Sequence, residues 1–146
     1  MELIRNPTFN FVIADDDPDD QYALQKVIWD SNQQHKITSV YNGMQLLEYL
    51  FRMGTYKNCK EPMPDCIFLD VNMPLLNGIE VLEKIRAAHA FKLLKIHVLT
   101  SSSCQEEKEK IMKLGADGFF TKHPDVENLK VIFRNIISDM LPAKMS

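Results

Sequence analysis

From Phe9 to Asp20 the chain reads FNFVIADDDPDD, an apolar run that ends in a dense group of acids. Five of the six residues from Asp15 to Asp20 are aspartates. Two like charges 4 Å apart repel each other by roughly 4 kcal/mol at an effective dielectric constant of about 20. This acidic group therefore needs compensation by a positive partner, and the rest of the chain indicates which one.

The composition indicates an ordinary globular chain. Its 146 residues predict one domain over 1–146, with a core over about 8–140. The net charge of −3 gives no reason to expect a nucleic acid or an anionic membrane as partner. No apolar run approaches the roughly 18–20 residues of a membrane span. Three cysteines without a CxxC pair indicate reduced thiols and a cytoplasmic protein.

Apolar, β-rich runs alternate with segments of helical periodicity. The runs occupy residues 9–14, 36–41, 65–70, 95–100 and 117–122. Such alternation predicts an α/β fold, a mostly parallel sheet with helices on both faces. The expected class is the flavodoxin-like, doubly wound (βα)5 sheet with strand order 2-1-3-4-5.

Each predicted helix has a capping residue at its start: Asp17, Asn42, Asn77, Ser103 and Asp125. Ser103 and Glu106 have the spacing of a capping box. In the first helix an apolar stripe is expected on Ala23, Leu24, Val27 and Ile28.

Polar residues follow the predicted strands at one edge of the sheet. Asp15 and Asp16 end the first strand, Asp70 the third, Thr100 the fourth and Lys122 the fifth. Since ligands of open α/β sheets bind beyond the carboxyl ends of the strands, these five side chains should share one crevice. Asp17, Asp19 and Asp20 instead favour the helix N-terminus through its macrodipole.

This set of residues suits phosphoryl transfer. Carboxylates without Cys or His favour a hard cation, and Mg²⁺ is typical where a phosphate completes the shell. A carboxylate can itself serve as nucleophile and form an aspartyl phosphate. Lys122 would supply a positive charge and Thr100 a hydroxyl donor for the phosphoryl oxygens.

Four motifs resemble the receiver domain of response regulators in two-component signalling: FVIADDDPDD, CIFLDVNMPLLNG, HVLTSSS and GADGFFTKH. The resemblance covers roughly residues 8–140. It implies that Asp70 is the phosphoacceptor and that Thr100 and Lys122 contact the phosphoryl group. It also implies that Mg²⁺ is held by the side chains of Asp16 and Asp70 and the main-chain carbonyl of Asn72, with Asp15 acting through water. Phe119 falls where the family often has an aromatic residue that rotates on activation.

The resemblance also implies partners. The long segment 54–64 and the apparent lack of an output domain are similar to single-domain regulators that partner phytochrome-type histidine kinases. A histidine kinase or histidine phosphotransfer protein is therefore the expected donor, with a protein target downstream. Family members also dimerise through the last two helices and the strand between them, so the resemblance implies a homodimer. The simpler interpretation of the apolar stripe on the final helix is that it packs in the core.

One departure from the family concerns the residue after the lysine. The family usually has proline there, whereas this chain has His123 followed by Pro124. We predict a cis Lys122–His123 bond and a trans His123–Pro124 bond, with the pull of the carboxylates on Lys122 offsetting the about 2.5–4 kcal/mol that a cis non-proline bond costs.

Three other functions fit the residues less well. An Mg²⁺-dependent phosphohydrolase with an aspartate nucleophile needs a second Asp as acid and base, and the corresponding position here is Asn72. An FMN protein would have a Ser/Thr/Gly-rich phosphate loop where this chain has acids. A binding module that works without phosphorylation would not need the intact set of five residues. We therefore predict a phosphorylatable switch and not an enzyme acting on a separate substrate.

Overall fold

A computed structural model describes residues 7–122 and 125–145 of the chain. Five parallel strands form one sheet in the order β2-β1-β3-β4-β5. The strands are β1 (Asn10–Ala14), β2 (Lys36–Val40), β3 (Cys66–Asp70), β4 (Lys95–Thr100) and β5 (Gly118–Thr121). The helices are α1 (Pro18–Ser31), α2 (Gly43–Phe51), α3 (Gly78–Ala87), α4 (Gln105–Lys113) and α5 (Val126–Met145). The predicted flavodoxin-like α/β fold is confirmed.

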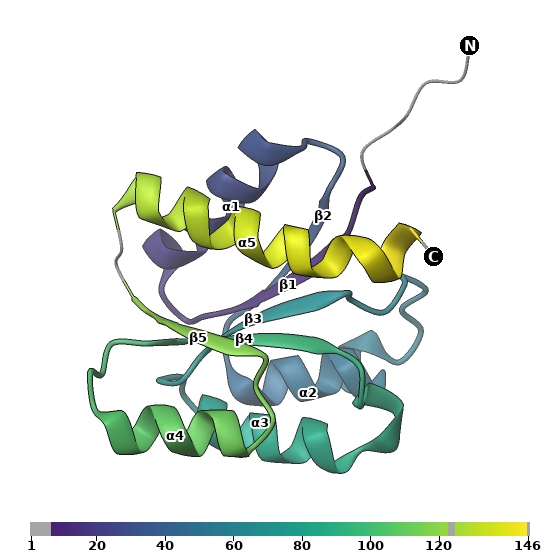
Figure 1. The fold of residues 1–146 in the computed structure, drawn as a ribbon. Helices are drawn as coiled ribbons and strands as arrows, with labels where there is room; N and C mark the ends of the chain where they lie inside the picture. Colours follow the sequence, from purple (N-terminus) through teal and green to yellow (C-terminus); the bar gives the residue numbers. More distant parts are fainter. Residues whose placement is uncertain (1–6, 123–124, 146) are drawn as a thin grey trace.

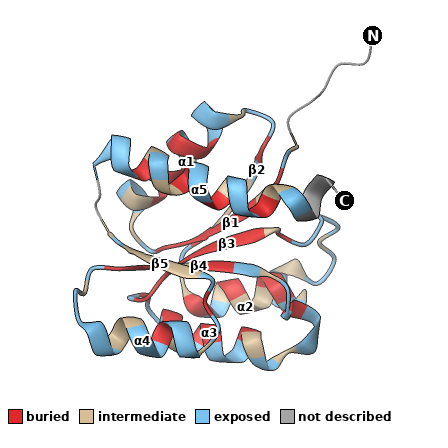
Figure 2. Ribbon diagram, viewed as in Figure 1, coloured by how far each residue is buried: buried red, intermediate tan, exposed pale blue. Residues whose placement is uncertain are grey.

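Helices cover both faces of the sheet (Figure 1). Helices α1 and α5 lie on one face, and α2, α3 and α4 lie on the other. Each face has its own hydrophobic core: Leu24 and Phe133 belong to the first, Leu46 and Val81 to the second. All five residues of β3 are buried, as expected for a central strand of a parallel sheet, and Figure 2 shows buried residues along the central strands and on the helices that cover them.

Four of the five predicted helix caps are confirmed. The side chains of Asp17, Asn42 and Asn77 accept backbone hydrogen bonds at the starts of α1, α2 and α3, and Asn77 forms a full capping box with Glu80. The carboxylate of Asp125 accepts a hydrogen bond from the Asn128 N–H at 2.8 Å. Short-range side-chain chemistry therefore sets where these helices begin.

Two local expectations were wrong. Helix α4 begins at Gln105, so Cys104 and not Ser103 occupies the capping position, and Cys104 makes no side-chain capping bond within the described residues. Glu107 therefore takes the third helical position that we had assigned to Glu106. In α1, Ala23 is exposed and Gln21 is buried in its place, because Gln21 shares the inward face with Leu24 and Ile28.

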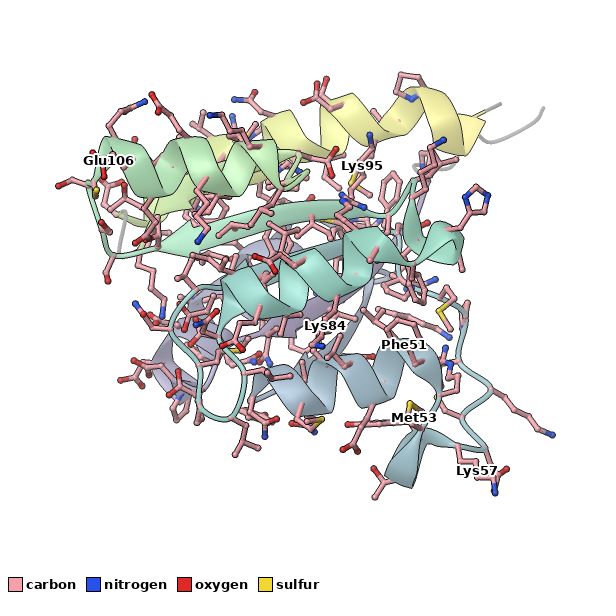
Figure 3. The ribbon with its side chains drawn as sticks, turned by 90° about the horizontal axis from the view of Figure 1, so that it is seen from below. Phe51, Met53, Lys57, Lys84, Lys95 and Glu106 are labelled. Atoms are coloured by element: carbon pink, nitrogen blue, oxygen red, sulfur yellow. The ribbon has the colours of Figure 1, made fainter. Side chains whose placement is uncertain are left out.

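The long connection after α2 lies at the far end of the molecule from the carboxyl ends of the strands. Figure 3 shows Phe51, Met53 and Lys57 at that end. Arg52 anchors the connection: its guanidinium donates to the sulfur of Cys59 at 3.0 Å and to the carbonyl of Glu61 at 2.6 Å. None of the helices in the described part of the chain is long and apolar enough to cross a membrane.

Candidate functional site

The carboxyl ends of the strands bring the predicted acids together. Asp70 is the last residue of β3, and Asp15 and Asp16 directly follow β1, which pairs with β3 in the sheet. One carboxylate oxygen from each of Asp15, Asp16 and Asp70 lies within 4.8 Å of the other two. Asp70 is 0% and Asp15 1% exposed, whereas Asp16 is exposed to solvent.

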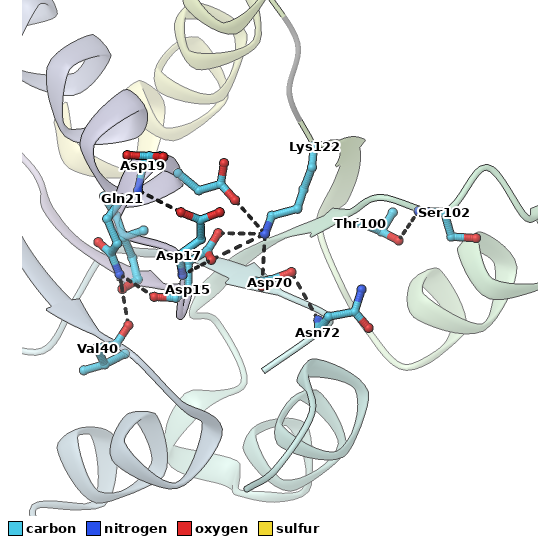
Figure 4. Close-up of polar contacts among 12 residues, drawn as sticks. Asp15, Asp17, Asp19, Gln21, Val40, Asp70, Asn72, Thr100, Ser102 and Lys122 are labelled. Atoms are coloured by element: carbon cyan, nitrogen blue, oxygen red, sulfur yellow. Dashed lines mark hydrogen bonds and ion pairs between the residues drawn. The ribbon is translucent and has the colours of Figure 1, made fainter. Parts of the chain in front are cut away.

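Lys122 follows β5 directly and reaches into this group of acids (Figure 4). Its ammonium lies 3.1 Å from Asp15 Oδ2 and 3.1 Å from Asp70 Oδ2. Its shortest ion pair, at 2.8 Å, is with Asp20 in the first turn of α1. We had assigned Asp20 only a role at the helix N-terminus, and the structure adds this contact. The positive partner that the acidic group requires is therefore Lys122, held by three carboxylates.

The environment shifts the pKa values of these groups. Burial raises the pKa of Asp15 from its ordinary 3.8 to about 6, and the charge of Asp70 adds to this, against the hydrogen bond from the Asp17 N–H. Burial also raises the pKa of Asp70, opposed by the Asn72 N–H and by Lys122. Burial alone would lower the pKa of Lys122, but its contacts with Asp20, Asp70 and Asp15 raise it. A nearby cation would therefore stabilise the charged forms of Asp15 and Asp70, which burial disfavours.

Backbone groups orient the two buried acids. The Asp17 N–H donates to Asp15 Oδ1 at 2.9 Å, and the Asn72 N–H donates to Asp70 Oδ1 at 3.1 Å. Gly78 allows α3 to start directly against Asp70, because a Cβ there would lie 2.4 Å from the Asp70 carbonyl oxygen. The loop after β3 is therefore packed tightly around Asp70.

Gln21 is a supporting residue that the sequence analysis missed. Its side-chain amide donates to the carbonyl oxygens of Ile13, Asp15 and Val40 at 3.0–3.1 Å. These contacts tie α1 to the ends of β1 and β2. Helical spacing from Leu24 was the available signal, since it places Gln21 on the inward face of α1.

Thr100 and Phe119 complete the predicted set, and both contact α4; among the described residues, Thr100 makes no hydrogen bond to Asp15, Asp16 or Asp70. The Thr100 side chain is fully buried at the end of β4, and its hydroxyl donates to Glu107 Oε1 at 2.7 Å. The Thr100 oxygen also accepts from the Ser102 N–H at 3.0 Å (Figure 4). Phe119 on β5 is half-buried, with the Lys108 ammonium 5.2 Å from its ring centroid. The predicted cis bond between Lys122 and His123 lies outside the described residues.

The donors fit a hard divalent cation. All three carboxylates offer oxygen, the ligand that Mg²⁺ and similar ions prefer, and repulsion among Asp15, Asp16 and Asp70 would be offset by the ion's charge. The exposed side of Asp16 leaves the group accessible from solvent. Asp15, Asp16 and Asp70 would therefore hold a divalent cation at this edge, next to the Lys122 ammonium.

Fold and site together define a signalling domain that receives a phosphoryl group. Residues 11–134 match the model of the response regulator receiver domain, and the chain belongs to that family. Receiver domains of two-component systems receive phosphoryl groups from histidine kinases, and they bind a divalent metal. The cluster of Asp15, Asp16 and Asp70 fits the phosphorylation site of such a domain.

Individual relatives narrow the comparison. The chain is 28% identical over 131 residues to response regulator Rcp1 of Synechocystis sp., covering 90% of this chain and 86% of that protein. The phosphorylated cyanobacterial phytochrome response regulator RcpA superposes with a TM-score of 0.82 at 27% identity, covering 92% and 95% of the two chains. The Mn²⁺-bound form of Rcp1 superposes with a TM-score of 0.79 at 26% identity, covering 89% and 92%. The chain is thus similar along most of its length to response regulators, one of which is a phytochrome response regulator.

Proposed function

We propose that this protein is a signalling switch that accepts a phosphoryl group on Asp70, with Mg²⁺ bound beside it. The observation that carries this assignment is the position of Asp70: it is fully buried, next to Asp15 and Asp16, and 3.1 Å from the Lys122 ammonium. A nucleophile held between a cation site and a fixed positive charge is suited to phosphoryl transfer, where positioning and charge neutralisation supply most of the catalysis.

The transfer step itself is simple. An oxygen of Asp70 forms a bond to phosphorus while the bond from phosphorus to the donor's histidine nitrogen breaks, and the electron pair stays on the imidazole. Lys122 neutralises an oxygen of the arriving phosphoryl group. The side chains of Asp16 and Asp70 and the main-chain carbonyl of Asn72 would hold Mg²⁺, with Asp15 acting through water. When bound, the ion supplies positive charge to the phosphoryl oxygens.

The switch would run from Thr100 to Phe119. Thr100 would turn its hydroxyl toward the phosphoryl group, and the ring of Phe119 would turn into the space that Thr100 leaves. Support comes from their location on paired strands, since Val98 on β4 pairs with Phe119 and Thr100 pairs with Thr121 on β5. The surface around α4 would change as a result, and a protein target would read that change.

The proposed donor is a histidine kinase of the phytochrome type or a histidine phosphotransfer protein. The similarity to RcpA and Rcp1 supports this choice.

A cytoplasmic location, a single domain over residues 1–146 and a homodimer through α4, β5 and α5 stay predictions. Two other functions, an Mg²⁺-dependent phosphohydrolase and a binding module without phosphorylation, are outcomes of the test below.

The experiment uses acetyl phosphate as donor, with Mg²⁺, and measures intact mass over time. We expect the wild-type protein to gain one phosphoryl group and Asp70→Asn to gain none. Asp19→Asn is the matched control, because Asp19 is an exposed acid of the same sequence cluster. Uptake by Asp70→Asn at the wild-type rate would refute the assignment. Continuous release of inorganic phosphate from added phosphomonoesters would favour the phosphohydrolase. Binding of a protein target without any gain in mass would favour the binding module.

A further inference from the structure

We propose that Glu107 is a positioning residue that holds the Thr100 hydroxyl on α4 and so competes with the phosphoryl group for it. This inference deepens the proposed function and rests on it. The Thr100 hydroxyl donates to Glu107 Oε1 at 2.7 Å, a distance typical of a strong hydrogen bond to a carboxylate. A hydroxyl has a single proton, so Thr100 cannot donate to Glu107 and to a phosphoryl oxygen at the same time.

The oxygen of the Thr100 hydroxyl also accepts a hydrogen bond. Thr100 Oγ1 accepts the Ser102 N–H at 3.0 Å, and the residue is fully buried. The side chain therefore has one donor and one acceptor contact, both toward the loop and helix that follow β4. Figure 4 shows the Thr100 oxygen on the Ser102 side, away from Asp70. Reaching the phosphoryl group requires the Thr100 side chain to give up the contact with Glu107.

The start of α4 explains why Glu107 is available for this role. Glu107 is the third residue of the helix, the position whose glutamate reaches back to the cap residue in a capping box. Here the cap residue is Cys104, which makes no side-chain capping bond in the part of the chain that is described. The Glu107 carboxylate points instead to Thr100. The orientation of the switch residue is thus linked directly to the first turn of α4.

The next residue of α4 contacts the other half of the proposed switch. The Lys108 ammonium lies 5.2 Å from the Phe119 ring centroid, within the range of a cation–π contact. Glu107 and Lys108 are neighbours in one helical turn, and both are half-buried. Helix α4 therefore contacts both Thr100 and Phe119 in the phosphoryl-free protein. Because the Glu107 contact must break before Thr100 can reach a phosphoryl group, the cost of breaking it weakens the apparent affinity for that group.

The test measures binding of beryllofluoride, a mimic of the acyl phosphate, by the full chain in Mg²⁺. Because a hydrogen bond to a charged group corresponds to a factor of about ten or more in an equilibrium constant, Glu107→Ala should tighten the apparent Kd about tenfold. Glu107→Gln keeps an acceptor oxygen without the charge, so its Kd should lie between those of wild type and Glu107→Ala. Glu106→Ala is the matched control: Glu106 is exposed at the same end of α4 (Figure 3), and its loss should change the Kd less than about twofold.

A double variant tests whether the effect runs through the hydroxyl. Thr100→Val keeps the shape of the side chain but removes the donor, so adding Glu107→Ala to it should no longer tighten binding. The proposal is overturned if Glu107→Ala binds beryllofluoride no more tightly than wild type, if Glu106→Ala gives the same gain, or if the gain persists beside Thr100→Val. Failure of the proposed function has a different signature, since the wild-type protein itself would then bind no beryllofluoride.

Discussion

Replacing Lys122 by methionine tests the charge balance on which the site depends. The ammonium lies 2.8 Å from Asp20, 3.1 Å from Asp15 and 3.1 Å from Asp70. Methionine keeps an unbranched side chain but has no charge. The variant would therefore leave three carboxylates facing one another without their cation.

The expected loss of stability follows from burial. Asp15 is 1% and Asp70 0% exposed, so water screens these charges little. Removing one partner of a buried ion pair typically costs about 3–5 kcal/mol, and we expect a loss of this size in the free energy of unfolding without Mg²⁺. The matched control is Lys36→Met, because the Lys36–Glu61 pair is long, at 3.7 Å, and exposed. Loss of such a surface pair should cost no more than about 1 kcal/mol.

The loss should depend on pH in a definite direction. In the wild-type protein the pKa of Asp15 is raised from 3.8 to about 6. Burial favours the protonated form of Asp15. Its contribution to the free energy of unfolding, about 3 kcal/mol, is therefore present below about pH 4 and is lost as the pH rises through about 6. Lys122 lowers the pKa of both Asp15 and Asp70, so its removal would raise both values further. The destabilisation should therefore be largest near neutral pH and smaller in acid.

Urea denaturation, followed by circular dichroism, measures this directly at about pH 7.5 and about pH 5, with EDTA and with Mg²⁺. Mg²⁺ should stabilise Lys122→Met more than wild type, because the ion supplies the missing positive charge. A loss below about 1 kcal/mol at the higher pH, or an equal loss at both pH values, would show that Lys122 does not balance the buried acids.

Three further substitutions have distinct expected outcomes. Asp16→Ala should weaken Mg²⁺ binding in calorimetry about tenfold or more without lowering the metal-free melting temperature, since it removes an exposed ligand and relieves repulsion; unchanged affinity would contradict this. Asp20→Asn should tighten beryllofluoride binding severalfold by releasing Lys122, and weaker binding would contradict this. Gln21→Leu should cost about 2–3 kcal/mol in urea denaturation, because the carbonyl oxygens of Ile13, Asp15 and Val40 lose the side-chain amide that joins them, and a cost below about 0.5 kcal/mol would exclude that role.

The sequence by itself determined the class of fold and the group of acids at one edge of the sheet. Alternating strand and helix periods predict a parallel sheet, and the carboxyl ends of parallel strands meet at one edge. That geometry was enough to expect Asp15, Asp16 and Asp70 side by side, with Lys122 near them, as the structure shows. The helix starts at Asp17, Asn42, Asn77 and Asp125 were equally accessible, because a cap involves only residues within one turn.

Only the tertiary structure decided the partners of Asp20 and Glu107. Asp20 meets Lys122, and Glu107 meets Thr100, because of how α1 and α4 are rotated against the sheet. A shift of one residue in a helix start turns its side chains by about 100°, which is why placing the α4 cap at Ser103 instead of Cys104 hid the role of Glu107. That rotation is set by packing of whole helices on the core, a long-range quantity that local patterns do not contain.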